Sequence, residues 1–124
     1  HLLNAHLGQA FQLNERGKYA SALFQAEVVL GMASRNTGGH VAAAVALNGL
    51  NRRAEALKHM LEARENAKTA EEWSNVGAAF KRLENYPEAE AALRRSLELD
   101  PDGALPRRLL AEVLAAQGKS PASP

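Results

Sequence analysis

Apolar residues recur at steps of three and four along most of the chain, the spacing of one face of an α-helix. The clearest apolar stripes are Tyr19, Ala22, Leu23, Ala26, Val29 and Leu30; then Leu50, Ala54, Leu57 and Leu61; and Tyr86, Ala89, Leu93 and Leu97. The other face of the first of these helices carries Lys18, Ser21, Gln25 and Glu27. A helix with one apolar face needs a partner to pack on, so the pattern predicts helices that pack against one another.

Residues that end or start helices separate the apolar segments. They are Gly17, Asn36 to Gly39, Gly49, Asn85 with Pro87, Asp100 to Gly103, and Gly118. We therefore predict seven helices, at about residues 2–15, 18–32, 38–48, 51–65, 70–83, 87–99 and 104–117. Residues 119–124 contain too few apolar side chains to pack, and we predict that they form a disordered tail.

Composition supports an all-α fold and narrows the functional classes. The chain is rich in alanine and leucine, and aromatic residues make up only 5% of it. Its net charge of +1 gives no overall field to attract nucleic acid, so we expect no nucleic-acid partner. The absence of cysteine excludes disulfides, thiolate metal sites and thiol catalysis, but it leaves the cellular location open. No apolar run approaches the length of a membrane span, so we expect no membrane insertion.

Several positions recur with a period near 34 residues. Tyr19 and Tyr86 are 67 residues apart, and so are Ala22 and Ala89, with Ala54 between the two alanines. Paired helices at this period are typical of helical repeat proteins, although three amphipathic helix pairs in an ordinary bundle are an alternative.

The third helix pair resembles the tetratricopeptide repeat, whose pattern is W-x2-L-G-x2-Y, then A-x3-F, then P. The matching residues are Trp73, Val76-Gly77, Phe80, Ala89, Leu93 and Pro101. Small residues at Gly77 and Ala89 would let two helices approach closely, whereas the large side chains would fill the space between helices and repeats.

Two other segments look like further copies. The first has Leu7-Gly8 and Phe11, followed by Tyr19 and Ala22, with about two extra residues between its helices. The middle copy, over residues 41–64, lacks aromatic residues. The resemblance implies an α-solenoid in one domain over residues 1–118, with three repeats at about 3–35, 36–69 and 70–103 and a capping helix at about 104–117.

Residues with reactive side chains do not form a catalytic pattern. The histidines at positions 1, 6, 40 and 59 lack metal-site spacing, and no carboxylate lies in an apolar stretch that would raise its pKa. No serine follows the glycine-flanked pattern of a hydrolase nucleophile, and there is no glycine-rich phosphate loop. We therefore predict a protein that is not an enzyme and needs no metal or cofactor.

The resemblance implies a concave groove lined by the first helix of each repeat. We aligned Leu7-Gly8, Val41-Ala42 and Val76-Gly77 to find its residues. The predicted groove consists of His6, Gln9, Gln12, His40, Ala43, Leu47, Asn75, Ala78, Lys81, Arg82 and Arg108. Its alanines would admit a peptide or helix and its basic end would favour acidic residues, so the predicted ligand is an acidic and apolar segment of a partner protein. Alternatively, Ala43 and Ala78 are small only to allow helix packing.

Three functions follow from this interpretation. The leading prediction is a non-catalytic scaffold or adaptor that binds a peptide or helix of a partner in the groove. One alternative is an accessory domain of a larger enzyme such as a transferase, because the sequence does not begin with methionine. Another is a self-associating module that forms a homo-oligomer through exposed repeat ends. Some members of the family clamp the carboxyl terminus of chaperones, but Ala5, Gln9 and His40 depart from that pattern.

Overall fold

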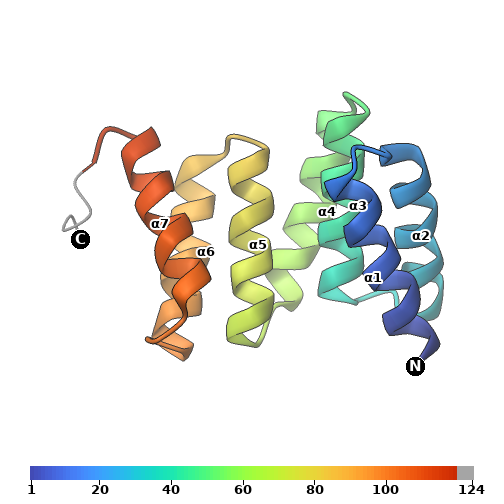
Figure 1. Cartoon of the computed structure of the whole chain (residues 1–124), viewed down its shortest axis with the longest axis horizontal. Helices are drawn as coiled ribbons and strands as arrows, with labels where there is room; N and C mark the ends of the chain where they lie inside the picture. The colour runs from blue at the N-terminus through green and yellow to red at the C-terminus, as the bar shows by residue number, and fades with distance from the viewer. Residues whose placement is uncertain (120–124) are drawn as a thin grey trace. The chain divides into compact units, whose positions relative to one another are not determined.

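The structure is a computed structural model that describes residues 1–119, and all of its regular elements are α-helices (Figure 1). They are α1 (Leu2–Glu15), α2 (Tyr19–Met32), α3 (Thr37–Gly49), α4 (Arg53–Asn66), α5 (Ala70–Arg82), α6 (Tyr86–Leu99) and α7 (Ala104–Ala116). The predicted all-α helical repeat fold is confirmed, and no helix boundary differs from its predicted position by more than two residues. Of the predicted disordered tail, residues 120–124 lie outside the described residues.

Local side-chain chemistry explains where several helices begin. Thr69 and Glu72 form a capping box at the start of α5, in which each side chain accepts a hydrogen bond from the other residue's backbone N–H at 3.1 Å. At the start of α3, the Asn36 side chain accepts a hydrogen bond from the Gly39 N–H at 2.7 Å. Pro87 lies in the first turn of α6, where its missing N–H costs no helical hydrogen bond.

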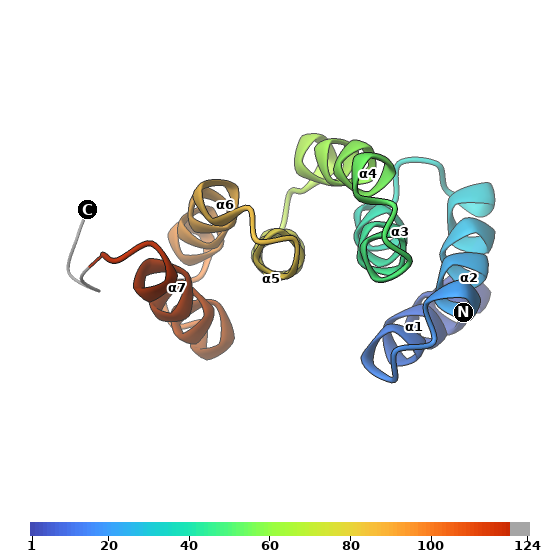
Figure 2. The same ribbon diagram turned by 90° about the horizontal axis from the view of Figure 1, so that it is seen from above.

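The helices form two compact units, which we describe separately. Unit 1 comprises residues 1–66 and contains α1 to α4; α3 is its central helix and contacts α1, α2 and α4. Unit 2 begins at Ala67 and contains α5 to α7, each of which contacts the other two (Figure 2). The single domain over residues 1–118 stays a prediction.

The same turn follows the first helix of each pair and follows α7. The second residue after the helix has a positive φ, of 73° at Gly17, 63° at Asn51, 59° at Glu84 and 71° at Gly118. The next residue then donates its N–H to the carbonyl five positions earlier, at 2.8 to 2.9 Å. This is the Schellman ending of a helix, in which the left-handed residue turns the chain so that the last carbonyls are satisfied. The four positive-φ residues follow one another at intervals of 34, 33 and 34, which is the true repeat of the fold.

This turn corrects the alignment of the first helices. Three residues join α1 to α2, and three residues join α5 to α6, so the two extra residues predicted for the first copy are absent. Counting back from the turn, the counterparts of Gly77 are Ala10 and Ala44, not Gly8 and Ala42. Both alanines are fully buried. The alignment that matched Leu7-Gly8 and Val41-Ala42 to Val76-Gly77 is therefore wrong by two residues in α1 and in α3.

Glycine packing supports the corrected register. A Cβ atom added to Gly77 would lie 2.6 Å from the Leu93 side chain, so α5 and α6 approach each other closely at that point. A Cβ atom added to Gly8 would meet nothing within 4 Å. Gly77 is needed for helix packing, whereas Gly8 only resembles it in sequence.

The two units have different cores. In unit 1, buried Ala10, Ala26, Ala42 and Ala43 form a cluster surrounded by larger apolar side chains from α1 and α2. In unit 2, the fully buried side chains include Phe80, Leu83, Leu93 and Leu114. Trp73 is only half-buried, so Phe80 rather than the tryptophan is the main buried aromatic residue of this unit.

Candidate functional site

The predicted groove residues of unit 1 are not equally accessible. His40, Ala43 and Leu47 on α3 are 7%, 0% and 2% exposed, and Ala43 belongs to the alanine cluster of the core. Gln9 and Gln12 on α1 are exposed, and His6 is half-buried. In unit 1, a partner therefore has access to the two glutamines of α1, while the small size of Ala43 serves helix packing.

Two side-chain pairs that contain histidine join the helices within unit 1. His6 Nδ1 on α1 lies 2.6 Å from Gln25 Oε1 on α2, and His40 Nδ1 on α3 lies 2.9 Å from His59 Nδ1 on α4. Each pair is separated by 19 residues, and the turn register makes the two pairs equivalent. The same polar contact therefore ties the first helix to the second in both repeats of this unit.

The hydrogen bonds of His40 determine which nitrogen donates in the His40–His59 pair. His40 Nε2 lies 2.8 Å from the Ser34 carbonyl oxygen, so this nitrogen donates its N–H. In the neutral ring Nδ1 is then the acceptor, and His59 Nδ1–H donates to it. Burial lowers the pKa of His59, and the charge of a protonated His40 lowers it further, whereas Glu27, Glu55 and Glu62 act in the opposite direction.

The space beside this pair does not have the ligands of a metal centre. An open depression of about 340 Å³ is lined by His40, Lys58, His59, Leu61 and Glu62. Across residues 1–119, no three histidine, aspartate or glutamate side chains are grouped as metal ligands. The histidine pair therefore serves as a contact between α3 and α4.

In unit 2, two helices present one continuous surface, which we call the α5–α7 face. It consists of Glu71, Ser74, Ala78 and Lys81 on α5, and Leu105, Arg108 and Glu112 on α7. These residues recur at steps of three and four, so each set lies along one side of its helix. Contact between α5 and α7 makes the two sets neighbours.

At one end of this face, two cations share a single carboxylate. Lys81 Nζ lies 2.7 Å from Glu112 Oε1, and Arg108 Nε lies 4.0 Å from Glu112 Oε2. The hydrogen bond from Lys81 lowers the pKa of Glu112. All three side chains are at least one third exposed, and the Arg108 side chain is 69% exposed. The cluster therefore keeps one excess positive charge that solvent, or a partner, can reach.

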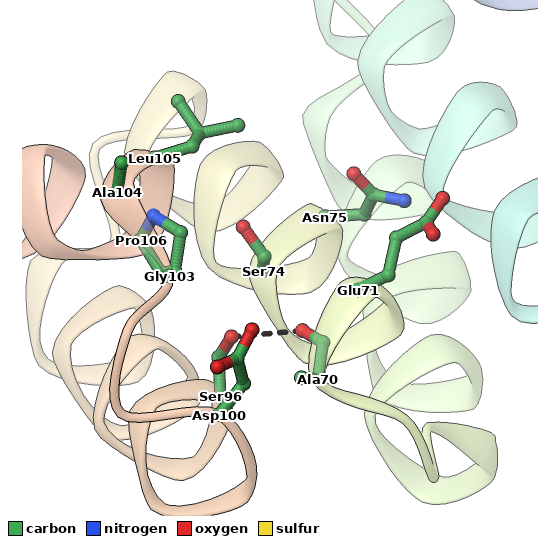
Figure 3. A pocket seen from close by; sticks show the side chains of 10 residues that line it. All are labelled: Ala70, Glu71, Ser74, Asn75, Ser96, Asp100, Gly103, Ala104, Leu105 and Pro106. Carbon is green, nitrogen blue, oxygen red and sulfur yellow. Dashed lines mark hydrogen bonds between the residues drawn. The ribbon is translucent and has the colours of Figure 1, made fainter.

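At the other end of the face lies a pocket of about 410 Å³ (Figure 3). Its walls are Ala70, Glu71, Ser74 and Asn75 from α5, Ser96 and Asp100 at the end of α6, and Gly103, Ala104, Leu105 and Pro106 at the start of α7. Ser74 is 7% exposed, and its hydroxyl has no hydrogen-bond partner. The Ala70 carbonyl one turn earlier already accepts the Ser96 hydroxyl at 2.8 Å, which Figure 3 marks with a dashed line.

The structure adds residues to the predicted set in unit 2. The predicted Asn75, Ala78 and Lys81 are half-buried, whereas Arg82 and Arg108 are exposed. Ser74, Glu71 and Glu112 were missed. Ser74 precedes Ala78 by four residues and Lys81 by seven, and Glu112 follows Arg108 by four. This helical spacing was the signal that could have found them.

A second carboxylate cluster joins α6 to the end of α7. The Glu90 side chain is 13% exposed and accepts hydrogen bonds from Arg94, Gln117 and Lys119 at 2.9, 2.9 and 3.0 Å. Hydrogen bonds from Gln117, Lys119 and Arg94 lower the pKa of Glu90 from 4.5 to about 2. The hydrogen bonds from Gln117 and Lys119 hold the end of α7 against α6.

Comparison with known proteins identifies the repeat formed by α5 and α6. The family model for the tetratricopeptide repeat matches residues 70–102. The chain contains a tetratricopeptide repeat and has the fold of this family. The suspected resemblance is thereby confirmed, and no curated protein matches the chain.

Solved structures of low sequence identity share this tetratricopeptide fold. The first such domain of human RPAP3 is 22% identical with a TM-score of 0.71, and the match covers 95% of this chain and 94% of that one. The first such domain of Spaghetti (RPAP3), bound to the HSP90 peptide SRMEEVD, is 21% identical with a TM-score of 0.67, covering 94% of each chain. A structure of Naa15/Naa10 bound to HypK-THB has a TM-score of 0.79 at 22% identity, covering 94% of this chain but only 18% of that chain.

Proposed function

We propose that the chain is a non-catalytic interaction module and that the α5–α7 face binds an acidic, partly apolar segment of a partner protein. The tetratricopeptide repeat at residues 70–102 supports a protein-interaction role. The observation that carries the proposal is the convergence of Lys81 and Arg108, from two helices, on the single carboxylate of Glu112. This convergence leaves an excess cation on an exposed face.

The chemistry of the face suits a carboxylate next to apolar side chains. Arg108 can offer a planar pair of N–H donors to a carboxylate, and Lys81 adds a second donor close by. Ala78 keeps the floor between the two helices low, so the backbone of a bound segment can come near. The HSP90 peptide SRMEEVD on the RPAP3-type domain, with three acidic and two apolar residues, supports this class of ligand for the fold.

The other predicted groove residues are retained where they are accessible. Asn75 and Arg82 are proposed as contacts at the edges of the α5–α7 face. Gln9 and Gln12 stay predictions, because in the corrected register they correspond to the buried Val76 and Ala79 of α5. In the described residues, no helix is both long and apolar enough to cross a bilayer. The accessory-domain and self-association alternatives stay predictions.

A peptide titration tests the proposal. We expect acetyl-Ala-Leu-Ala-Glu-Leu-Glu-amide to shift backbone amide NMR signals of α5 and α7 in a saturable way. The Lys81→Gln/Arg108→Gln variant should weaken binding about tenfold, because two cationic donors are lost. The matched control is Lys58→Gln/Arg95→Gln, which removes the same charge from α4 and α6 and should leave binding unchanged. Absence of saturable shifts in wild type, or equal weakening in both variants, would contradict the proposal.

A further inference from the structure

The pocket at the start of α5 and α7 has chemistry opposite to that of the Lys81–Arg108 end. We propose that this pocket binds a basic side chain, Lys or Arg, of the same partner segment. The inference rests on the proposed function of the α5–α7 face and adds a second contact with a defined charge and a defined spacing.

The first argument is the unused hydroxyl of Ser74. A serine inside a helix commonly donates its hydroxyl to the carbonyl one turn earlier, because that acceptor is within reach. Here the Ala70 carbonyl already accepts the Ser96 hydroxyl, and Ser74 Oγ has no partner although the residue is 7% exposed. A buried polar group without a partner destabilises the folded protein. A ligand that forms a hydrogen bond to this group removes that cost, which favours binding. Ser74 lines the pocket, and a ligand there could use its oxygen as an acceptor.

The second argument is the charge of the pocket walls. Glu71 and Asp100 both line it, and neither forms an ion pair within the described residues. The Asp100 carboxylate accepts one hydrogen bond, from the Asp102 N–H at 3.2 Å. The starts of α5 and α7 each add a partial positive charge of about one half, the end of α6 adds a negative charge of about one half, and two full carboxylate charges exceed this sum. An anionic ligand would therefore be repelled, whereas an ammonium or guanidinium group would be attracted.

The third argument is the apolar wall opposite Ser74. In Figure 3, Ala104, Leu105 and Pro106 lie on one side of Ser74, and Asn75 and Glu71 lie on the other. Leu105 is 48% exposed, so much of its side chain is open to a ligand in the pocket. The aliphatic stem of a lysine or arginine packs well on such a surface while its charged end reaches carboxylates. The volume of about 410 Å³ holds such a side chain and the adjoining backbone.

Helix geometry then fixes the spacing in the ligand. Ser74 and Lys81 are seven residues apart on α5, which corresponds to about 10 Å along the helix axis. A peptide in the polyproline II conformation rises about 3.1 Å per residue with three residues per turn, so two side chains three positions apart lie on the same face and roughly 9 Å apart. The ligand motif is therefore a basic residue followed or preceded, three positions away, by an acidic residue.

Two designed peptides test the inference separately from the proposed function. The first, acetyl-Ala-Lys-Leu-Ala-Glu-Ala-amide, has the required spacing; in the second, norleucine replaces lysine and keeps the stem without the charge. We expect NMR titration of the full chain to show binding of the lysine peptide at least fivefold tighter, with its added shifts at Ser74, Ala104 and Leu105. A Ser74→Ala variant should lose about threefold of this binding and keep its thermal stability.

Charge variants decide the outcome. In Glu71→Gln/Asp100→Asn the two peptides should bind equally, whereas the control Glu84→Gln/Glu98→Gln, which removes the same charge elsewhere in unit 2, should keep the preference. Circular dichroism melting establishes that each variant is folded. If both peptides bind the wild type equally and Lys81→Gln/Arg108→Gln weakens both, the inference fails while the proposed function stands. If neither peptide binds, both fail.

Discussion

Units 1 and 2 use the same helix pair and the same turn, but they pack their helices with different chemistry. Counting from the turn, Leu93 in α6 corresponds to Ala26 in α2 and Met60 in α4. Trp73 in α5 corresponds to His6 and His40, and Ala92 corresponds to Gln25 and His59. Unit 2 thus fills its interior with large apolar side chains, whereas unit 1 combines an alanine core with polar contacts between its helices. The common backbone therefore depends on the turn and on small residues at the helix crossing.

The largest expected effect comes from the core of unit 2. Leu93→Ala should lower the free energy of unfolding of this unit by about 3 kcal/mol, because Leu93 is fully buried against Gly77 and truncation leaves a cavity. Native-state hydrogen exchange should show this loss in α5 to α7. Met60→Ala, at the equivalent fully buried position of unit 1, should affect α3 and α4 instead. Equal loss of protection across both units would contradict their separate packing.

The next effect separates the two glycines that the sequence motif treats alike. Gly77→Ala should destabilise unit 2 by about 2 kcal/mol, because its Cβ would overlap the Leu93 side chain. Gly8→Ala should stabilise α1 by about 1 kcal/mol, because alanine favours the helix and meets no obstacle there. Denaturant unfolding of both variants would measure this. If both substitutions were destabilising, the corrected register would be wrong.

A smaller effect is expected at the end of α7. Glu90→Gln should destabilise unit 2 by about 1 kcal/mol through the loss of its charged hydrogen bonds to Arg94 and Lys119. Because the pKa of Glu90 falls from 4.5 to about 2 on folding, this contribution is present above pH 4.5 and is lost as the pH falls toward 2. The control Glu98→Gln breaks only an exposed pair with Arg95 and should change stability by much less. Chemical denaturation at pH 7 and pH 3 would measure both.

The smallest effect is a pH dependence confined to unit 1. The folded-state pKa of His59 lies below its ordinary value of 6.5, so the unfolded chain takes up the proton first as the pH falls. Stability from this site is therefore full above pH 6.5 and declines below it. His59→Gln, which copies the His6–Gln25 pair, should reduce this decline in α3 and α4. Hydrogen exchange at pH 7 and pH 5 would test it, and an undiminished decline in the variant would assign the pH dependence to other groups.

Most of the fold could be predicted because its signals are local. The capping box at Thr69 and Glu72, Pro87 in the first turn of α6, and the glycine after α1 each act within a few residues of themselves. The register of the first helices could not be read in this way. Leu7-Gly8 and Phe11 match the motif in sequence, but no side chain packs against Gly8 in the structure.

The candidate site was predicted in part. Lys81 and Arg108 were identified by mapping the groove that the repeat resemblance implies, but their contact with a common partner, Glu112, depends on α7 packing beside α5. Helical spacing places Ser74 on the same side of α5 as Ala78, but its missing hydrogen-bond partner could not be recognised, because a serine becomes unpartnered only when its neighbours are buried and its acceptor is taken by Ser96. Conversely, His40 was predicted to face a partner, whereas it is buried and bonded to His59 and Ser34.

The sequence by itself determined the helices, their ends and the repeating pair, because periodicity and capping act between residues close in the chain. Only the tertiary structure decided which small residues lie at helix crossings, that Ala43 belongs to a core, and that Ser74 lines a pocket between three helices. These features depend on contacts between different helices, such as that of Gly77 with Leu93. Such contacts depend on how side chains of different sizes pack together, and the sequence of one helix does not specify the side chains that pack against it.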